Sequence, residues 1–175
     1  MTPRLHLIPC SPGQLLCLIE EPKRFPELAG FAAADGLREF FVSGEVSPQW
    51  LARLHSAAGP DPWQYGFFVV EPNMSVAVGT AGFKGPPDDH GIVEIAYAIV
   101  PACEGRGYAT EAARALVVSA FASEAVRRVR AHTLPAFNAS TRVLQKCGFR
   151  HMDTVVDPED GPVWRWERQR SPSLL

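Results

Sequence analysis

The sequence predicts a single α/β domain built on a mixed sheet, and three observations indicate that class. The length of 175 residues suits one domain with one sizeable core. The second half of the chain alternates apolar runs of strand length with segments of helical periodicity. No internal repeat, low-complexity tract or linker divides the chain, so the predicted domain spans residues 1–175.

The first third is predicted to hold one strand and several helices. Residues 4–8 (RLHLI) form a short apolar run, typical of a strand, that a proline closes. Serine followed by proline, at 11–12 and again at 47–48, is a typical helix start, with serine as the N-cap and proline in the first turn. Apolar side chains within residues 37–41 indicate a further helix between these two.

The remaining elements alternate along the chain. We expect strands at 63–71, 76–83, 92–100 and 126–133, helices at 109–121 and 138–147, and a closing hairpin at 149–156 and 163–167. The run IVEIAYAIV at 92–100 is apolar almost throughout, which predicts a strand buried on both faces. Gly148 is a suitable stop for the last helix.

Composition and charge exclude several classes of protein. Apolar residues make up 46% and charged residues 21%, as in ordinary soluble domains. The formal net charge of −2 does not favour a nucleic-acid binder, so we interpret Arg127, Arg128 and Arg130 as a solvated strand edge. No apolar run is long enough to span a membrane, and the start of the chain lacks the apolar segment of a signal peptide. A cytoplasmic protein is expected.

The four cysteines do not form a metal-binding pattern. They show neither a CxxC pair nor histidines at ligand spacing, and they are Cys10, Cys17, Cys103 and Cys147. No zinc or other metal site is therefore expected. Without an export signal, we expect all four to be reduced thiols.

Two glycines, Gly105 and Gly107, lie between a predicted strand and a predicted helix. A helix start presents unpaired N–H groups and the positive end of the helix dipole, and glycines let a phosphate approach the backbone. A Walker-type nucleotide loop needs a lysine that is missing here, and a Rossmann loop needs a third glycine where Thr110 stands. The pyrophosphate of coenzyme A and a plain strand–helix connection remain open.

The wider pattern resembles a known family. The segment 93-VEIAYAIVPACEGRGYATEA-112, followed by 138-NASTRVLQKCGF-149, is similar to the GNAT superfamily of acetyl-CoA-dependent N-acetyltransferases, and most of all to its RimJ/RimL-like branch. The resemblance covers about residues 76–149. It implies a GNAT-like mixed, mostly antiparallel, twisted central sheet of about seven strands flanked by about four helices.

The resemblance also implies an activity and its partners. The protein would move an acetyl group from acetyl-CoA to a primary amine by direct transfer in a ternary complex, and the amine would belong to a protein N-terminus or a small molecule. Neither a metal, a nucleic acid nor a membrane is implied as a partner, and a homodimer is compatible with the family. The alternatives are a non-catalytic acyl-CoA-binding or sensor domain on the same fold and a nucleotide-binding protein.

Coenzyme-binding roles follow from the resemblance, residue by residue. They fall on the strand end, the glycine loop with the helix start, and the start of the later helix: Ile99, Val100, Gly105, Arg106, Gly107, Tyr108, Ala109, Thr110 and Asn138. Asn138 is equally well explained as a helix N-cap. Ala102 and Glu104 stand where the family often has glutamine or arginine.

Two residues are predicted to take part in the chemistry. Glu94, a carboxylate in an apolar strand, is the predicted base or ligand of the substrate amine, acting through water; the alternative is a structural carboxylate with a nearby partner. Many GNAT members protonate the leaving thiolate with a tyrosine where this chain has Leu144, so Ser140 is the predicted substitute. Its alternative is a helix-start hydroxyl. Three aromatic residues are predicted to wall the acceptor pocket or to pack in the core: Trp50, Trp63 and Phe67.

Overall fold

The computed structural model describes residues 4–44 and 47–171, so the parts of the predicted domain at 1–3, 45–46 and 172–175 lie outside the described residues. The strands are β1 (His6–Pro9), β2 (Ala32–Ala33), β3 (Phe67–Glu71), β4 (Val76–Phe83), β5 (Ile92–Ile99), β6 (Arg128–Thr133), β7 (Arg150–Asp157) and β8 (Gly161–Gln169). The α-helices are α1 (Pro12–Glu20), α2 (Phe25–Ala29), α3 (Glu39–Val42), α4 (Pro48–Ser56), α5 (Pro62–Tyr65), α6 (Tyr108–Ala122) and α7 (Ala139–Lys146). Two short 3₁₀ turns complete the set, at Pro22–Arg24 and Pro101–Cys103.

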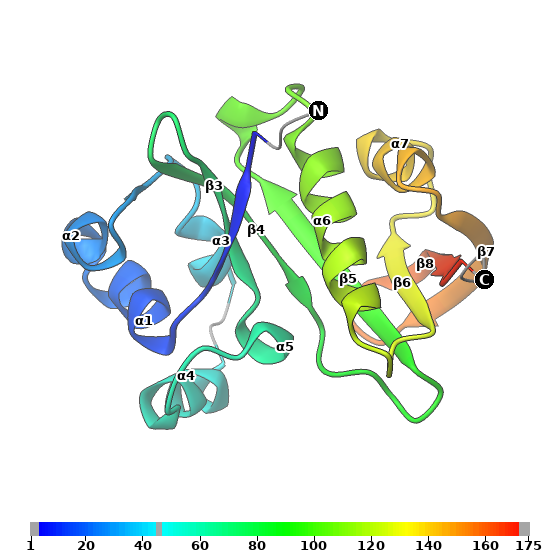
Figure 1. Cartoon of the computed structure of the whole chain (residues 1–175), viewed down its shortest axis with the longest axis horizontal. Helices are drawn as coiled ribbons and strands as arrows, with labels where there is room; N and C mark the ends of the chain where they lie inside the picture. Colours follow the sequence, from blue (N-terminus) through cyan, green and yellow to red (C-terminus); the bar gives the residue numbers. More distant parts are fainter. Residues whose placement is uncertain (1–3, 45–46, 172–175) are drawn as a thin grey trace.

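All strands belong to one sheet, in the order β1-β3-β4-β5-β6-β8-β7, with the short β2 beside β4. Only the β5–β6 and β2–β4 pairs are parallel. This confirms the predicted mixed, mostly antiparallel sheet, with eight strands in place of about seven. The helix estimate was too low, because the structure describes seven α-helices in residues 4–44 and 47–171. Figure 1 shows α6 in front of β5 and the short early helices on the far side of β3.

Side-chain caps explain where the early helices begin. The hydroxyls of Ser11 and Ser47 accept hydrogen bonds from backbone N–H groups three residues later, which confirms both predicted starts. The predicted strand at 63–71 is wrong in its first part. The carboxylate of Asp61 accepts from the N–H of Trp63 at 3.0 Å and begins α5, so the strand starts only at Phe67. The aromatic residues there resemble a strand, and they conceal the Asp-Pro helix start.

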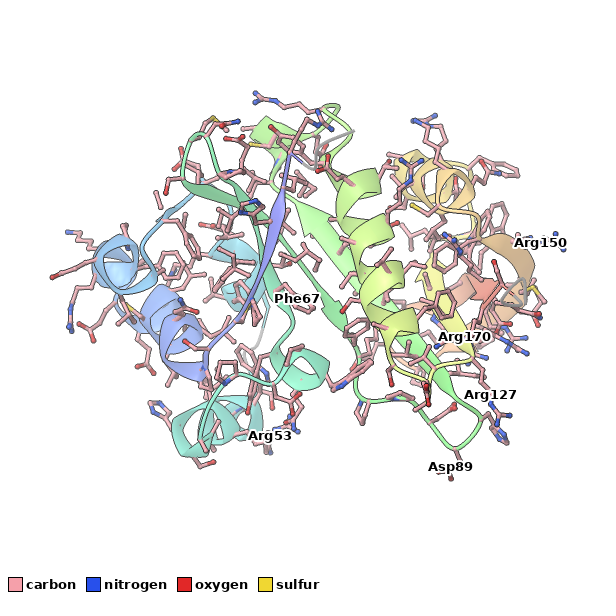
Figure 2. The ribbon with its side chains drawn as sticks, in the orientation of Figure 1. Arg53, Phe67, Asp89, Arg127, Arg150 and Arg170 are labelled. Atoms are coloured by element: carbon pink, nitrogen blue, oxygen red, sulfur yellow. The ribbon has the colours of Figure 1, made fainter. Side chains whose placement is uncertain are left out.

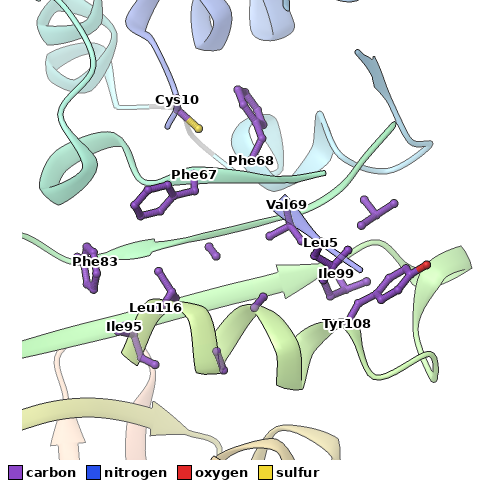
Figure 3. Packing of buried hydrophobic residues seen from close by; sticks show 14 of the residues in the cluster. Leu5, Cys10, Phe67, Phe68, Val69, Phe83, Ile95, Ile99, Tyr108 and Leu116 are labelled. Carbon is purple, nitrogen blue, oxygen red and sulfur yellow. The ribbon is translucent and has the colours of Figure 1, made fainter. Parts of the chain in front are cut away.

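The core lies on both faces of β3, whose five residues are all buried. Phe67 and Val69 lie on the side of α6, and Phe68 points to the opposite side (Figure 3). There the rings of Phe25, Phe31 and Phe68 pack edge to face, with centroids 5.4 to 5.7 Å apart. Such pairs contribute beyond their buried area, so this cluster fixes the early helices against the sheet.

The pairing of β5 changes along its length. It pairs with β6 only over residues 92–94, whereas its pairing with β4 covers residues 95–99. Beyond Glu94 the two parallel strands therefore part. The prediction of a strand buried on both faces is wrong for one face. Val93 is buried beneath α6, but Ala96 on the other face is exposed. Ala96 lines a cavity on that face in place of packing against another element.

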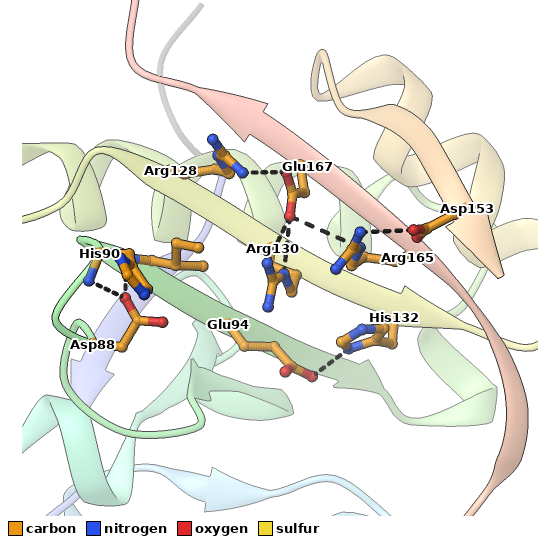
Figure 4. Close-up of polar contacts among 10 residues, drawn as sticks. Asp88, His90, Glu94, Arg128, Arg130, His132, Asp153, Arg165 and Glu167 are labelled. Atoms are coloured by element: carbon orange, nitrogen blue, oxygen red, sulfur yellow. Dashed lines mark hydrogen bonds and ion pairs between the residues drawn. The ribbon is translucent and has the colours of Figure 1, made fainter. Parts of the chain in front are cut away.

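Charged side chains fill one face of the sheet around β6 and β8. The carboxylate of Glu167 is almost fully buried and accepts hydrogen bonds from Arg128 at 2.9 Å and from Arg130 at 2.8 and 3.0 Å (Figure 4). Two arginines of the predicted solvated edge therefore have a structural partner, and Arg127 alone is exposed. Within the part of the chain that the structure describes, no helix is long and apolar enough to cross a membrane.

Replacing Phe68 with alanine should destabilise the protein strongly. The side chain is fully buried among other aromatic rings, and a Phe→Ala change in such a place costs about 3–5 kcal/mol. Phe137→Ala is the matched control, because that ring is 80% exposed, and it should cost less than about 1 kcal/mol. Denaturant unfolding of both variants measures the difference. Equal losses would contradict the described core.

Candidate active site

The glycine loop ends in an uncapped helix. Gly105 and Gly107 have positive φ angles of 73° and 82°, which L side chains rarely adopt. Gly107 is the N-cap of α6, and no side chain among residues 4–44 and 47–171 caps that helix, although it has 15 residues. The helices α1 and α7 differ, since the side chains of Ser11 and Asn138 cap them. The described side chains thus leave the first N–H groups of α6 without an acceptor, as an anion site requires.

A cavity of about 510 Å³ extends from this loop to β5. Its walls come from the end of β5, the loop, the first turn of α6 and one face of α7. Six of the nine residues predicted to bind coenzyme line it: Ile99, Gly105, Gly107, Tyr108, Ala109 and Thr110. The volume is typical of a small-molecule or cofactor site.

The other three predicted residues do not line the cavity. The N–H of Val100 donates to the carbonyl of Val78 at 2.9 Å, within the sheet. The guanidinium of Arg106 is exposed and lies 3.5 Å from the carbonyl of Ala102. Asn138 accepts from the N–H of Thr141 at 3.1 Å, which confirms its interpretation as a helix cap.

The edge of β5 along the cavity offers backbone hydrogen-bonding groups. In an antiparallel pair, the N–H and C=O of one residue point to the same side, and the side alternates along the strand. Val100 bonds to β4 in this way, so the even-numbered residues of β5 face β4. The N–H and C=O groups of Tyr97 and Ile99 therefore face the edge from which β6 has parted.

Beside Glu104, the cavity is lined by basic residues that the sequence analysis missed. Arg142 and Lys146 line it from one face of α7, where their spacing of four residues could have revealed them. Arg4 packs its guanidinium over the ring of Tyr108 at 5.2 Å, and its backbone N–H donates to Glu111 at 2.6 Å. A residue so far away in the sequence leaves no local pattern that predicts this contact.

Glu94 lies where β5 and β6 part, on the face of β5 opposite to Tyr97. Its Oε1 is 2.6 Å from Nζ of Lys84 and 2.9 Å from Nδ1 of His132 (Figure 4 draws the histidine). Burial alone would raise the pKa of Glu94, but the hydrogen bonds with His132 and Lys84 outweigh it and hold the pKa below its ordinary value. The carboxylate is therefore ionised at neutral pH and has a cation beside it.

Two further residues face the coenzyme-side cavity. Ser140, in the first turn of α7, is exposed and lines the cavity, whereas Leu144 is buried beneath it. Tyr97 also lines the cavity, and burial raises the pKa of its phenol. The β4–β5 register is regular from residue 95 to 99, so no bulge brings Tyr97 to the face of Glu94.

A second cavity, of about 390 Å³, meets the first at Tyr97 and Ala98, with Phe40 shared between them. It lies over β4 and β5 on the face that carries Ala96, where Thr80 and Gly82 also line it. The coenzyme-side cavity and this second cavity thus open onto the same point of β5.

A third cavity, of about 210 Å³, adjoins the second and shares Gln64, Tyr65 and Phe83 with it. We call the second and third cavities together the path. Trp50 and Trp63 line it, as the acceptor-pocket interpretation of these residues predicts. Among the described residues, no group of three or more His, Cys, Asp or Glu side chains could hold a metal ion.

Comparisons with known proteins agree with this geometry. The sequence profile described as an acetyltransferase (GNAT) domain matches residues 25–150. The uncharacterized N-acetyltransferase YjdG of Bacillus subtilis is 31% identical over 111 residues, which are 63% of this chain and 64% of that protein. The match therefore spans slightly less than two thirds of the relative's length.

Solved structures show the same fold. A GNAT-family acetyltransferase from Bacillus anthracis superposes with a TM-score of 0.62 at 17% identity, over 97% of this chain and 96% of the other. The aminoglycoside acetyltransferase AAC(6')-Ib in complex with coenzyme A and kanamycin gives a TM-score of 0.64 at 20% identity, over 95% of each chain. With the profile matching well over half of its length, the chain belongs to the GNAT acetyltransferase domain family.

Proposed function

We propose that this protein transfers the acetyl group of acetyl-CoA to a primary amine by direct attack within a ternary complex. One observation carries the proposal. The cavity at the glycine loop and the cavity on the opposite face of β5 meet at Tyr97 and Ala98, so two substrates could bring their reacting atoms together there. Holding both reactants in place supplies a large part of the rate of such reactions.

The coenzyme would occupy the first cavity along its whole length. Its pyrophosphate would accept hydrogen bonds from the backbone N–H groups of residues 105–110, where the dipole of α6 also favours negative charge. Arg142 and Lys146 would balance the remaining phosphate charge. The pantetheine amides would pair with the free backbone groups of Tyr97 and Ile99, in the manner of an added strand.

The chemistry requires a neutral amine, because an ammonium ion has no lone pair. An α-amine has a pKa of about 8 and a lysine-type amine one of about 10.4, so a base must take a proton. Glu94 would receive it through water, since four residues of strand, about 13 Å, separate it from Ala98. The neutral amine then forms the C–N bond as the C–S bond breaks, and the second proton lost by the nitrogen passes to the departing thiolate through the hydroxyl of Ser140 or through water.

The proposal leaves two classes of amine acceptor. A protein N-terminus and a small-molecule amine both fit the general chemistry, and the assignment to the RimJ/RimL-like branch rests on the sequence motifs. The second candidate function is a non-catalytic acyl-CoA sensor, which the charge-balanced Glu94 and the buried Leu144 favour. Release of free thiol from acetyl-CoA, measured with and without a panel of amines, separates the two, because only an enzyme gives amine-dependent release.

Gly107→Val should weaken coenzyme A binding by at least about tenfold, or about 1.4 kcal/mol. The added side chain would fill the place of the phosphate and strain a backbone angle of +82°. Gly30→Val is the matched control, since Gly30 has a φ of +80° and lies at the end of α2, away from the cavity. Calorimetric titration of both variants measures affinity, and equal losses of affinity would place the coenzyme elsewhere.

Glu94→Gln should lower the acetylation rate about 10²–10⁴-fold near neutral pH, the range typical of losing a general base. The defect should shrink at high pH, where more of the amine is already neutral. A pH–rate profile of the variant measures this, with Glu21→Gln as control, because Glu21 also pairs with a cation but is exposed. A rate unchanged across the profile would remove Glu94 from the mechanism.

Glu94 should also make the free energy of unfolding depend on pH. Its pKa is lower in the folded than in the unfolded chain, so the ionised carboxylate stabilises the fold above the unfolded pKa of about 4.3. That contribution is lost as the pH falls through the folded pKa. The difference in unfolding free energy between wild type and Glu94→Gln should therefore be constant above about pH 5.5 and shrink below about pH 4. A difference that grew in acid would contradict the described ion pairs.

A chelator and a thiol reductant should leave the acetylation rate unchanged. No described group of side chains could hold a metal ion, and the four cysteines are free, with three of them buried. Assays with excess chelator, with reductant and with neither provide the comparison. Loss of activity with the chelator would reveal a metal requirement that the described residues do not explain.

A further inference from the structure

The cavities on the acceptor side carry positive but no negative charge. No described residue that lines the second or the third cavity is an aspartate or a glutamate. Arg53 and Lys84, by contrast, both line the third cavity. The nearby carboxylate of Glu94 is already balanced, because Lys84 lies 2.6 Å from it and His132 2.9 Å. A substrate with several ammonium groups would therefore meet no unbalanced carboxylate among these residues.

The walls between these charges are apolar and aromatic. The rings of Trp63 and Phe83, which both line the third cavity, lie 4.5 Å apart. Phe41 stacks on Trp50 at 6.4 Å across the same region. Rings that already pack against one another form a firm wall, which favours an apolar body and penalises a polar one without partners.

The register of β4 sets the length of the path. Thr80 pairs with Ala98 at the point where the first two cavities meet, and Lys84 follows four residues later beside the third cavity. At about 3.4 Å per residue this separation is about 13 Å. Arg53 lies beside the same end of the path, exposed on α4 (Figure 2).

We propose that the acceptor is a monoamine whose apolar body ends in an acidic group, with the amine at Ala98 and the acid near Arg53. This inference rests on the proposed acetyl transfer and narrows its substrate class. The proposed acceptor differs in its charge from kanamycin, a molecule with several amines, with which the aminoglycoside acetyltransferase AAC(6')-Ib was solved. The acidic end would pair with Arg53, since the charge of Lys84 is already matched by Glu94, and a second amine there would be repelled by Arg53.

Three probes with one eight-carbon body test the charge preference: 8-aminooctanoate, n-octylamine and 1,8-diaminooctane. Their body spans about 10 Å, which suits the path. The wild-type protein should give a kcat/KM for 8-aminooctanoate about fivefold above that for 1,8-diaminooctane, because exposed charge pairs contribute up to about 1 kcal/mol. n-Octylamine should fall between them.

Charge reversal at Arg53 provides the decisive comparison. Arg53→Glu should lower the ratio of the acid to the diamine about tenfold, so that the diamine becomes the better substrate, and Arg53→Ala should give an intermediate ratio. Arg127→Glu makes the same charge change on another part of the surface and should leave the ratio unchanged (Figure 2).

The outcomes are distinguishable from failure of the proposed function. Acetylation of n-octylamine with equal rates for the acid and the diamine would overturn the charge preference and leave the transferase intact. A wild-type preference for the diamine, or an equal shift in Arg127→Glu, would also overturn it. Absence of thiol release with all three probes, in a protein that binds coenzyme A, would overturn the transferase activity and this inference with it.

Discussion

The site depends on the short length over which β5 and β6 are paired. Three residue pairs, from Ile92 to Glu94 on β5, are all that join the two parallel strands before they part. If the pairing continued, the backbone N–H and C=O groups of Tyr97 and Ile99 would form hydrogen bonds with β6. Instead they face an open edge, beside the uncapped start of α6, and the cavities on the two faces of β5 meet there. The short pairing of β5 with β6 thus leaves room for the coenzyme and lets the acceptor reach it.

The charged contacts lie next to the place where the strands part. Glu94 belongs to the last paired position on β5, and its carboxylate joins a lysine from the loop after β4 to a histidine on β6. Glu167 binds two arginines of β6 from the neighbouring strand. A buried carboxylate without such partners would be costly, so these contacts fix the position of β6 relative to β5. The same contacts make Glu94 a weak base, because they stabilise its ionised form.

Sequence alone predicted the parts of the fold that local chemistry controls. The serine caps of α1 and α4, the hairpin at the end of the chain and the glycine loop all follow from short patterns and were found in the structure. The start of β3 was misplaced, because a run of aromatic residues concealed the cap that Asp61 provides. Burial of β5 was overestimated, since a cavity lies over the face that carries Ala96, and the apolar run does not reveal this long-range feature.

The candidate site was predictable to a similar extent. Most of the residues matched by motif do line the coenzyme-side cavity, because the strand, the loop and the helix that carry them are consecutive in the chain. Arg4, Lys84 and His132 were missed, since only the folded sheet brings them next to Tyr108 and Glu94. Residues of the early helices, which carry no recognisable motif, line the cavities on the acceptor side. The charge and the aromatic walls of these cavities therefore became known only from the structure.

Hydrogen–deuterium exchange, with and without coenzyme A, tests the central claim most directly. If the coenzyme uses the open edge of β5 and the start of α6, saturation should slow exchange at the amides of Tyr97, Ile99 and residues 105–110. Amides of β1 and β3 should exchange as before, because those strands lie away from the open edge. Unchanged exchange at β5 and the glycine loop, with protection confined to residues elsewhere, would show that the parting of β5 from β6 does not form the coenzyme site.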